Sequence, residues 1–181
     1  GHYKKPDFDL MWQHFPDHVD YPTLQDLHSY IGGVLAKNIT TPGFGANGNT
    51  CAARMSRALN YGNAPIAKSV TSRLRTSTMT GGDGFLYIFR VREIKTYLTA
   101  ALGPVTSVVD SDFFNAFKGQ RGIVSFDVQG WSDASGHVAL ATMNAATAAG
   151  FGLGSALYRP GLSVEEVRAN AARFIAAWHG D

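Results

Sequence analysis

In the first half of the chain, apolar residues recur at intervals of three and four, as on one face of a helix. This spacing predicts a helix over 23–37, capped by Thr23 with Asp26 three residues later. A second helix is predicted over 51–60, with Gly62 just beyond it as a left-handed cap. The N-terminal part therefore reads as helical.

The middle of the chain changes to alternation of apolar and polar residues. The clearest case is 123–129, where Val124, Phe126 and Val128 alternate with polar neighbours, which is typical of a strand. Strands are also predicted over 85–91, 137–142 and 150–158, and short helices over 94–101 and 111–117.

Near the C-terminus, Ser163 and Glu166 have the spacing of a capping box, and the apolar residues that follow predict a helix over 163–178. Helices first, then a mostly sequential antiparallel sheet, is an α+β pattern. With 181 residues, of which 45% are hydrophobic, we expect one domain over 1–181.

Charge and composition exclude several classes of function. A net charge of +2 without clusters of lysine and arginine predicts neither a nucleic-acid groove nor a membrane-binding face. No apolar run reaches the roughly 18 residues of a membrane span, and the N-terminus lacks the apolar segment of a signal peptide. We therefore expect that any export is leaderless. Scattered histidines and one cysteine give no spacing suited to a metal, and no cofactor is expected.

The single cysteine, Cys51, lies at the predicted start of a helix, directly after a glycine-rich loop over 38–49. A helix N-terminus carries unpaired N–H groups and partial positive charge, which favour the nucleophilic thiolate. A lone cysteine is more often a small buried hydrophobic residue, but such a residue needs neither the loop nor the helix start. Cys51 is thus the leading candidate for chemistry.

A thiol nucleophile needs a base within hydrogen-bond reach. His137 opens the predicted strand 137–142, far from Cys51 in the sequence, whereas four other histidines lie in the helical N-terminal part and His179 lies in the tail. Taken alone, His137 is better interpreted as a structural, hydrogen-bonded residue at the end of a strand. The pairing of a helix-start cysteine with a strand-start histidine is the pattern of a papain-like thiol hydrolase.

Four blocks of sequence resemble, in order and at similar spacing, the fourth family of amidase effectors of the type VI secretion system. The likeness covers about residues 8–140. The blocks are 31–33 (IGG), 49–60 (NTCAARMSRALN), 87–92 (YIFRVR) and 130–137 (GWSDASGH).

The resemblance implies a papain-like fold of the cell-wall peptidase type, with the cysteine on the helical part and the histidine on the antiparallel sheet. It implies cleavage of the bond between D-glutamate and meso-diaminopimelate in peptidoglycan stem peptides, with Cys51 as nucleophile and His137 as base. It also implies a toxin injected into the periplasm of a rival bacterium by the secretion apparatus, and a cognate immunity protein in the producer.

The third catalytic member is left open, because no Asp or Glu follows His137 in the stretch up to Gly150. Asn144 and Asp133 are equal candidates to orient the imidazole, and either one also suits a turn cap. Asn49 is a candidate second donor to the oxyanion, and Arg54 is a candidate contact for a substrate carboxylate, although such an arginine is more often a solvated side chain. Trp131 and Ser132 are candidates to line the substrate groove, and for Trp131 a role as anchor of the turn is slightly favoured.

Two other readings remain. One is a different thiol hydrolase or an acyltransferase on the same scaffold, which would release a different product from the cell wall. The other is a catalytically weakened descendant that binds a partner or a wall fragment, which the alanine-rich stretch after His137 favours.

Overall fold

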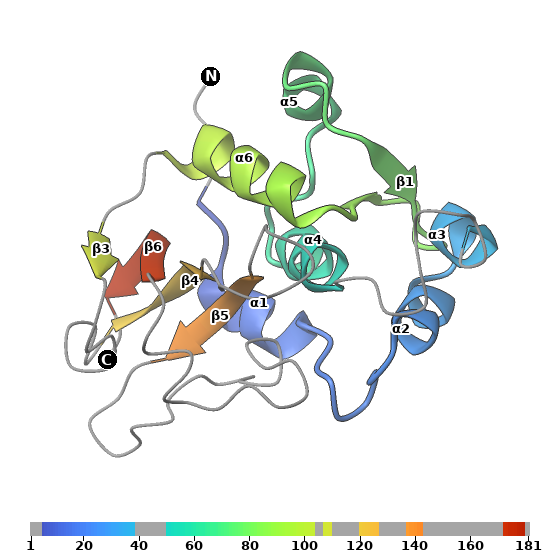
Figure 1. Cartoon of the computed structure of the whole chain (residues 1–181), viewed down its shortest axis with the longest axis horizontal. Coiled ribbons are helices and arrows are strands. Elements are labelled where there is room, and N and C mark those ends of the chain that lie inside the picture. The colour runs from blue at the N-terminus through green and yellow to red at the C-terminus, as the bar shows by residue number, and fades with distance from the viewer. Residues whose placement is uncertain are drawn as a thin grey trace. The chain divides into compact units, whose positions relative to one another are not determined.

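The computed structural model describes residues 5–38, 50–103, 107–109, 120–126, 137–142 and 172–179 (Figure 1). The chain divides into two compact units, Gly1–Tyr97 and Leu98–Asp181, and each is described by itself. Helix α6 (Val91–Leu102) begins in the first unit and ends in the second. It confirms the helix predicted over 94–101 and extends it at both ends. The predicted elements over 111–117 and 150–158 lie outside the described residues.

The first unit is built on α4 (Cys51–Tyr61), which packs against α1 (Phe8–His14). Helix α4 begins at Cys51, which confirms the predicted helix start. Gly62 ends the helix, but its φ of −94° is not the left-handed conformation that the sequence led us to expect. Glycine is required there for a different reason, because a Cβ at position 62 would lie 2.5 Å from Cγ of the buried Met11.

The helix predicted over 23–37 forms as two helices, α2 (Leu24–Ile31) and α3 (Gly33–Lys37). The capping box of Thr23 and Asp26 is present, as predicted. The break comes at Gly32, whose φ of 76° leaves the helical region. A Cβ at Gly33 would lie 2.4 Å from the main chain of Gly81, so the paired glycines let this joint pack directly against the following hairpin.

That hairpin pairs β1 (Thr78–Thr80) with β2 (Leu86–Ile88) in antiparallel fashion. Strand β2 is much shorter than the strand predicted over 85–91, since α6 already starts at Val91. The short helix α5 (Lys68–Arg73) precedes it. The outer edge of β2 is bound by α4: the Ser56 hydroxyl donates to the Ile88 carbonyl (3.1 Å) and accepts from the Ile88 N–H (3.0 Å).

The second unit contains a four-stranded antiparallel sheet in the order β3-β6-β4-β5, which can be followed in Figure 1. Its strands are β3 (Ser107–Val109), β4 (Gln120–Phe126), β5 (His137–Thr142) and β6 (Ala172–His179). The prediction for 137–142 is confirmed to the residue. Strand β4 confirms the predicted strand over 123–126 but begins three residues earlier, and 127–129 lie outside the described residues. The neighbours Val124 and Ser125 are both buried, so that both faces of the strand are covered.

The helix predicted over 163–178 is wrong for 172–178, which lie in β6, and its predicted start at Ser163 and Glu166 lies outside the described residues. This strand pairs on both sides, with Phe174 opposite Ser107 on β3 and opposite Val124 on β4. Its alanines and spaced aromatic residues fit a helix or a strand equally well, and the pairing with two neighbours decides the outcome. Within the described part of the chain, no helix has the length and apolarity to cross a membrane.

Candidate active site

Cys51 is the first residue of α4, and its side chain is 1% exposed. The preceding Thr50 occupies the N-cap position with φ −95° and ψ −2°, and its side chain makes no capping hydrogen bond. The helix start therefore keeps its first-turn N–H groups uncapped by Thr50. These groups and the partial positive charge of the helix end are suited to an anion at this point.

The Thr50 hydroxyl is bound by Arg54 instead. Nε of Arg54 donates to Thr50 Oγ1 (2.9 Å), one turn along the same helix. Nη1 donates to the carbonyls of Pro16 and Asp17, both at 2.9 Å, and Nη2 donates to the carbonyl of Tyr21 at 2.6 Å. Arg54 is fully buried, so it has no exposed atom with which to contact a substrate. The geometry thus speaks against the predicted substrate role and favours a structural one.

Two histidines of the first unit are held neutral near this arginine. Burial, and next to it the positive charge of Arg54, lower the pKa of His28 to about 4. Burial and Arg54 likewise lower the pKa of His18 to about 4, against a smaller opposing effect of Asp17. At neutral pH neither ring carries the proton of an imidazolium, so neither suits a thiolate–imidazolium pair.

His14 is also in the wrong place for Cys51. Its ring stacks on Tyr61, with 5.1 Å between centroids. Tyr61 ends α4, ten residues from Cys51, which is about 15 Å along a helix. Among the histidines that the structure describes, the first unit therefore offers no suitable base.

The second unit contributes His137 and His179. His137 opens β5 opposite Phe126, the last residue of β4. His179 lies opposite Gln120, at the other end of β4, about 20 Å away along the strand. The two histidines thus mark opposite ends of the sheet. Several predicted site residues lie outside the described residues: Asn49, Trp131, Ser132, Asp133 and Asn144.

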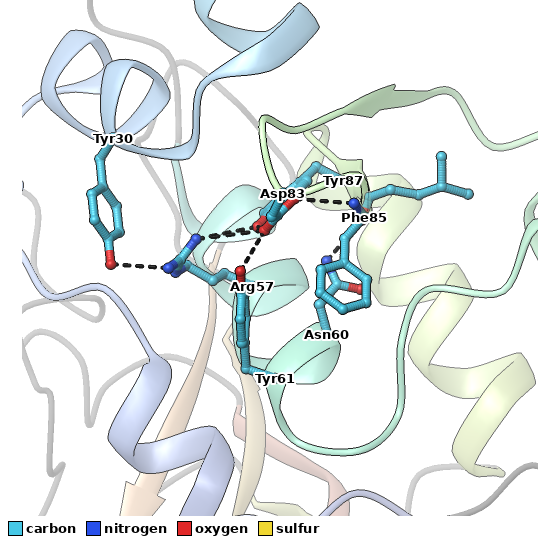
Figure 2. A network of polar contacts seen from close by, with 8 residues as sticks. Tyr30, Arg57, Asn60, Tyr61, Asp83, Phe85 and Tyr87 are labelled. Atoms are coloured by element: carbon cyan, nitrogen blue, oxygen red, sulfur yellow. Dashed lines mark hydrogen bonds and ion pairs between the residues drawn. The ribbon is translucent and has the colours of Figure 1, made fainter.

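A second cluster of polar contacts surrounds Arg57, one turn beyond Arg54 (Figure 2). Its guanidinium lies 4.4 Å from the ring centroid of Tyr30 and 4.5 Å from that of Tyr61. Nη2 donates to the Tyr30 hydroxyl (2.9 Å), and Nη1 lies 3.7 Å from the Asp83 carboxylate. The side chains of Arg57 and Asp83 are only 13% and 17% exposed.

Asp83 also accepts from two tyrosines. Oδ2 takes hydrogen bonds from the hydroxyls of Tyr61 (2.8 Å) and Tyr87 (2.6 Å), and Oδ1 takes one from the N–H of Phe85 (3.0 Å). Burial, followed by the hydrogen bond to Asp83, raises the pKa of Tyr87 well above its usual range. The cluster joins α4 to the turn between β1 and β2, and the charge of Arg57 is matched by Asp83.

The sequence pattern alone does not reveal these two arginine environments. The spacing of Arg54, Ser56, Arg57 and Asn60 on α4 carries a signal only in retrospect, as four polar residues on a helix that is buried almost all round. Asn60 completes the set, since Nδ2 donates to the Leu86 carbonyl (2.9 Å) and Oδ1 accepts from the Ile66 N–H (2.8 Å). Across the described ranges, no three His, Cys, Asp or Glu residues gather as a metal site would require.

Comparison with known proteins points to one family. The model described as "Type VI secretion system (T6SS), amidase effector protein 4" (Tae4) matches residues 47–174, a span that includes Cys51 and His137. No curated protein sequence matches the chain.

Solved structures agree. The chain is similar to the structure of an effector–immunity system, Tae4/Tai4, from Salmonella typhimurium, with 29% identity over 94% of this chain and 98% of that chain and a TM-score of 0.72. A crystal structure of a Tae4–Tai4 complex from the same organism is 34% identical over 77% of this chain and 84% of that one, with a TM-score of 0.66. The effector Tae4 from Enterobacter cloacae is 28% identical over 96% and 98% of the two chains, with a TM-score of 0.70.

Proposed function

The chain belongs to the amidase effector protein 4 family of the type VI secretion system, and we propose that Cys51 and His137 perform its amidase reaction. The proposed substrate is the peptidoglycan stem peptide, and the proposed bond is that between D-glutamate and meso-diaminopimelate. The fold proposed is papain-like, with the nucleophile on a helix of the first unit and the base on the sheet of the second.

In the proposed reaction, the Cys51 thiolate attacks the amide carbonyl and forms a tetrahedral oxyanion. The main-chain N–H of Cys51 stabilises that charge, with Asn49 as a second donor. The intermediate collapses to a thioester as the His137 imidazolium gives its proton to the leaving amine. His137 then takes a proton from water, which attacks the thioester, releases the carboxylic acid and restores the thiolate–imidazolium pair.

One observation carries this proposal: Cys51 is the first residue of α4, and Thr50 does not cap that helix. The partial positive charge of the helix end favours the thiolate of a cysteine in this position. The described histidines of the first unit add support by exclusion, because two are held neutral beside Arg54 and the third lies at the far end of α4.

Around this pair, Asp133 or Asn144 is proposed to orient the His137 ring, and Trp131 and Ser132 to contact the stem peptide. An orienting side chain fixes the imidazole tautomer and stabilises its charged form. The two candidates make different predictions. Replacement of the true partner by alanine would lower kcat and change the pH profile, whereas replacement of a turn residue would lower stability alone.

The solved relatives are described as effector–immunity complexes, and we propose that a cognate immunity protein likewise binds this chain. The proposed route is export through the type VI apparatus and action in the periplasm of a target bacterium. Periplasmic expression with and without a candidate immunity protein tests both points. Lysis is expected only when the toxin is directed to the periplasm and the immunity protein is absent.

The decisive assay is digestion of purified peptidoglycan. We expect the intact chain to release a free amine on diaminopimelate, and Cys51→Ala and His137→Ala to lower the rate by roughly a thousandfold or more. Circular dichroism and binding of the immunity protein provide the control for folding. If Cys51→Ala digests the wall as fast as the intact chain, the cysteine mechanism is wrong. A different newly freed amine would leave the mechanism standing and replace the substrate bond.

The burial of the thiol favours one alternative. Cys51 is 1% exposed, and a stem peptide must reach the sulfur for attack to occur. A chain in which the sulfur stays covered would bind a wall fragment or a protein without cleaving it. Alkylation of Cys51 by a small reagent in the native state separates the two. Rapid alkylation is expected for an enzyme, and a thiol that reacts only in urea supports the binding protein.

A further inference from the structure

Arg54 makes an unusual set of contacts for a buried cation. Nη1 and Nη2 donate to the main-chain carbonyls of Pro16, Asp17 and Tyr21. Nε donates to the Thr50 hydroxyl. No ion pair between Arg54 and a carboxylate occurs in the described part of the chain. Its donors are therefore satisfied by neutral groups, while its charge is not cancelled by a direct partner.

We infer that Arg54 is a positioning residue, which fixes the first turn of α4 against the 16–21 turn and whose cation favours the thiolate of Cys51. The inference rests on the proposed function, since it gives the thiolate a catalytic use. Cys51 and Arg54 are three residues apart on one helix, and side chains at that spacing are neighbours.

The acceptor turn is itself organised for this contact. The Asp17 carboxylate accepts from the N–H groups of Val19 (2.9 Å) and Asp20 (2.8 Å), and the Asp17 carbonyl accepts from the Tyr21 N–H (3.0 Å). These bonds fold the chain so that the carbonyls of Pro16, Asp17 and Tyr21 converge on one guanidinium. The planar fork of arginine fits three such acceptors, whereas a lysine ammonium does not offer that geometry.

The charges around Arg54 act in the required direction. Burial lowers the pKa of Arg54 to about 10, and attraction to Cys51 and Asp17 opposes that decrease. Arg54 thus remains protonated at neutral pH. Because an attraction between two charges stabilises both, the same interaction favours the ionised form of Cys51. Among the described residues, His18 and His28 also face Arg54, and burial, together with its positive charge, lowers their pKa values to about 4.

Arg54 also acts through Thr50. The hydrogen bond from Nε holds the Thr50 hydroxyl, and the Thr50 side chain makes no cap on the helix. Since Thr50 directly precedes Cys51, this bond holds the guanidinium of Arg54 at the start of α4.

The test measures thiol ionisation directly, by the carbon-13 chemical shift of Cys51 Cβ as a function of pH. This signal needs no reagent to reach the sulfur, and the chain has one cysteine to label. We expect Arg54→Gln to move the midpoint of ionisation upward by about one pH unit or more. The matched control is Arg57→Gln on the same helix, whose charge is already paired with Asp83. It is expected to leave the midpoint unchanged.

Equal midpoints in the intact chain and Arg54→Gln, or equal shifts in Arg54→Gln and Arg57→Gln, would overturn the inference. If Arg54→Gln does not fold, the pair Thr50→Val and Thr50→Ser decides. Thr50→Val removes the hydroxyl that accepts from Arg54 Nε and is expected to raise the midpoint of Cys51 ionisation. Thr50→Ser keeps that hydroxyl and is expected to leave the midpoint unchanged. A Thr50→Val midpoint equal to that of the intact chain contradicts the inference. A failure of the proposed function is seen in a different experiment, in which Cys51→Ala would still digest peptidoglycan.

Discussion

Arg54 and Arg57 lie one turn apart on α4 and are accommodated in opposite ways. Arg54 is fully buried among neutral oxygen atoms, whereas Arg57 is partly exposed between two tyrosine rings and beside the Asp83 carboxylate. A cation that is hydrogen-bonded but not neutralised can still act on a nearby anion. A cation with its own carboxylate mainly joins two elements. Of the two, only the Arg54 environment is thus arranged to influence Cys51.

The largest expected effect comes from removing the Arg54 side chain. Arg54→Met leaves the carbonyls of Pro16 and Tyr21 without this donor and removes one of two donors to the Asp17 carbonyl. We expect a loss of about 3–5 kcal/mol in the free energy of unfolding. Arg57→Met is expected to lose about 1–2 kcal/mol, since its partners reach water. Urea unfolding of both variants measures the difference. Equal losses would contradict the distinction between the two environments.

Low pH is expected to lower the free energy of unfolding through the two buried histidines near Arg54. His18 and His28 have pKa values lowered from 6.5 to about 4, so the unfolded chain binds protons that the folded chain does not. Their contribution to stability is complete above about pH 6.5 and is lost as the pH falls toward 4. For the buried His28 the loss is roughly 2–3 kcal/mol.

Urea unfolding near neutral pH and at about pH 4.5 measures this loss. His28→Leu is the comparison variant, because it removes the titrating ring and should flatten the pH dependence. An unchanged pH dependence in that variant would show that His28 does not carry the effect.

A smaller effect is expected from the Asp83 side. Asp83→Asn weakens the attraction to Arg57 and the hydrogen bonds from Tyr61 and Tyr87, for a loss of about 1–2 kcal/mol. In a double-mutant cycle with Arg57→Gln we expect a coupling energy of about 1 kcal/mol. Added salt should reduce this coupling, and a coupling near zero would show that the pair is not formed in solution.

The smallest expected change is that of Tyr30→Phe. It removes the hydroxyl that accepts from Arg57 Nη2 but keeps the ring against the guanidinium. Since Tyr30 is 46% exposed, water replaces the lost acceptor, and a loss below about 0.5 kcal/mol is expected. The Cys51 carbon-13 titration should be unchanged in this variant. A shifted titration would mean that the two arginine environments communicate.

Local signals predicted the parts of the fold that local chemistry decides. The capping box at Thr23, the helix start at Cys51 and the strand opened by His137 all follow from a few neighbouring residues. The C-terminal strand β6 was missed because its residues satisfy both periods, and pairing with β3 and β4 selects one of them.

The environment of Arg54 could not be predicted from the sequence for a related reason. Three of its four partners are main-chain carbonyls more than thirty positions away, and a main-chain carbonyl is not encoded by any particular residue type. Arg54 therefore read as a candidate for substrate binding, although its surroundings assign it a buried, structural position.

The central claim is that the sulfur of Cys51 attacks the substrate, and mass spectrometry of the protein quenched during turnover on soluble stem peptide tests it most directly. The account predicts a transient increase in mass equal to the acyl fragment, located on Cys51 and absent from Cys51→Ser. Full turnover without any adduct on Cys51, together with activity in Cys51→Ser, would contradict it.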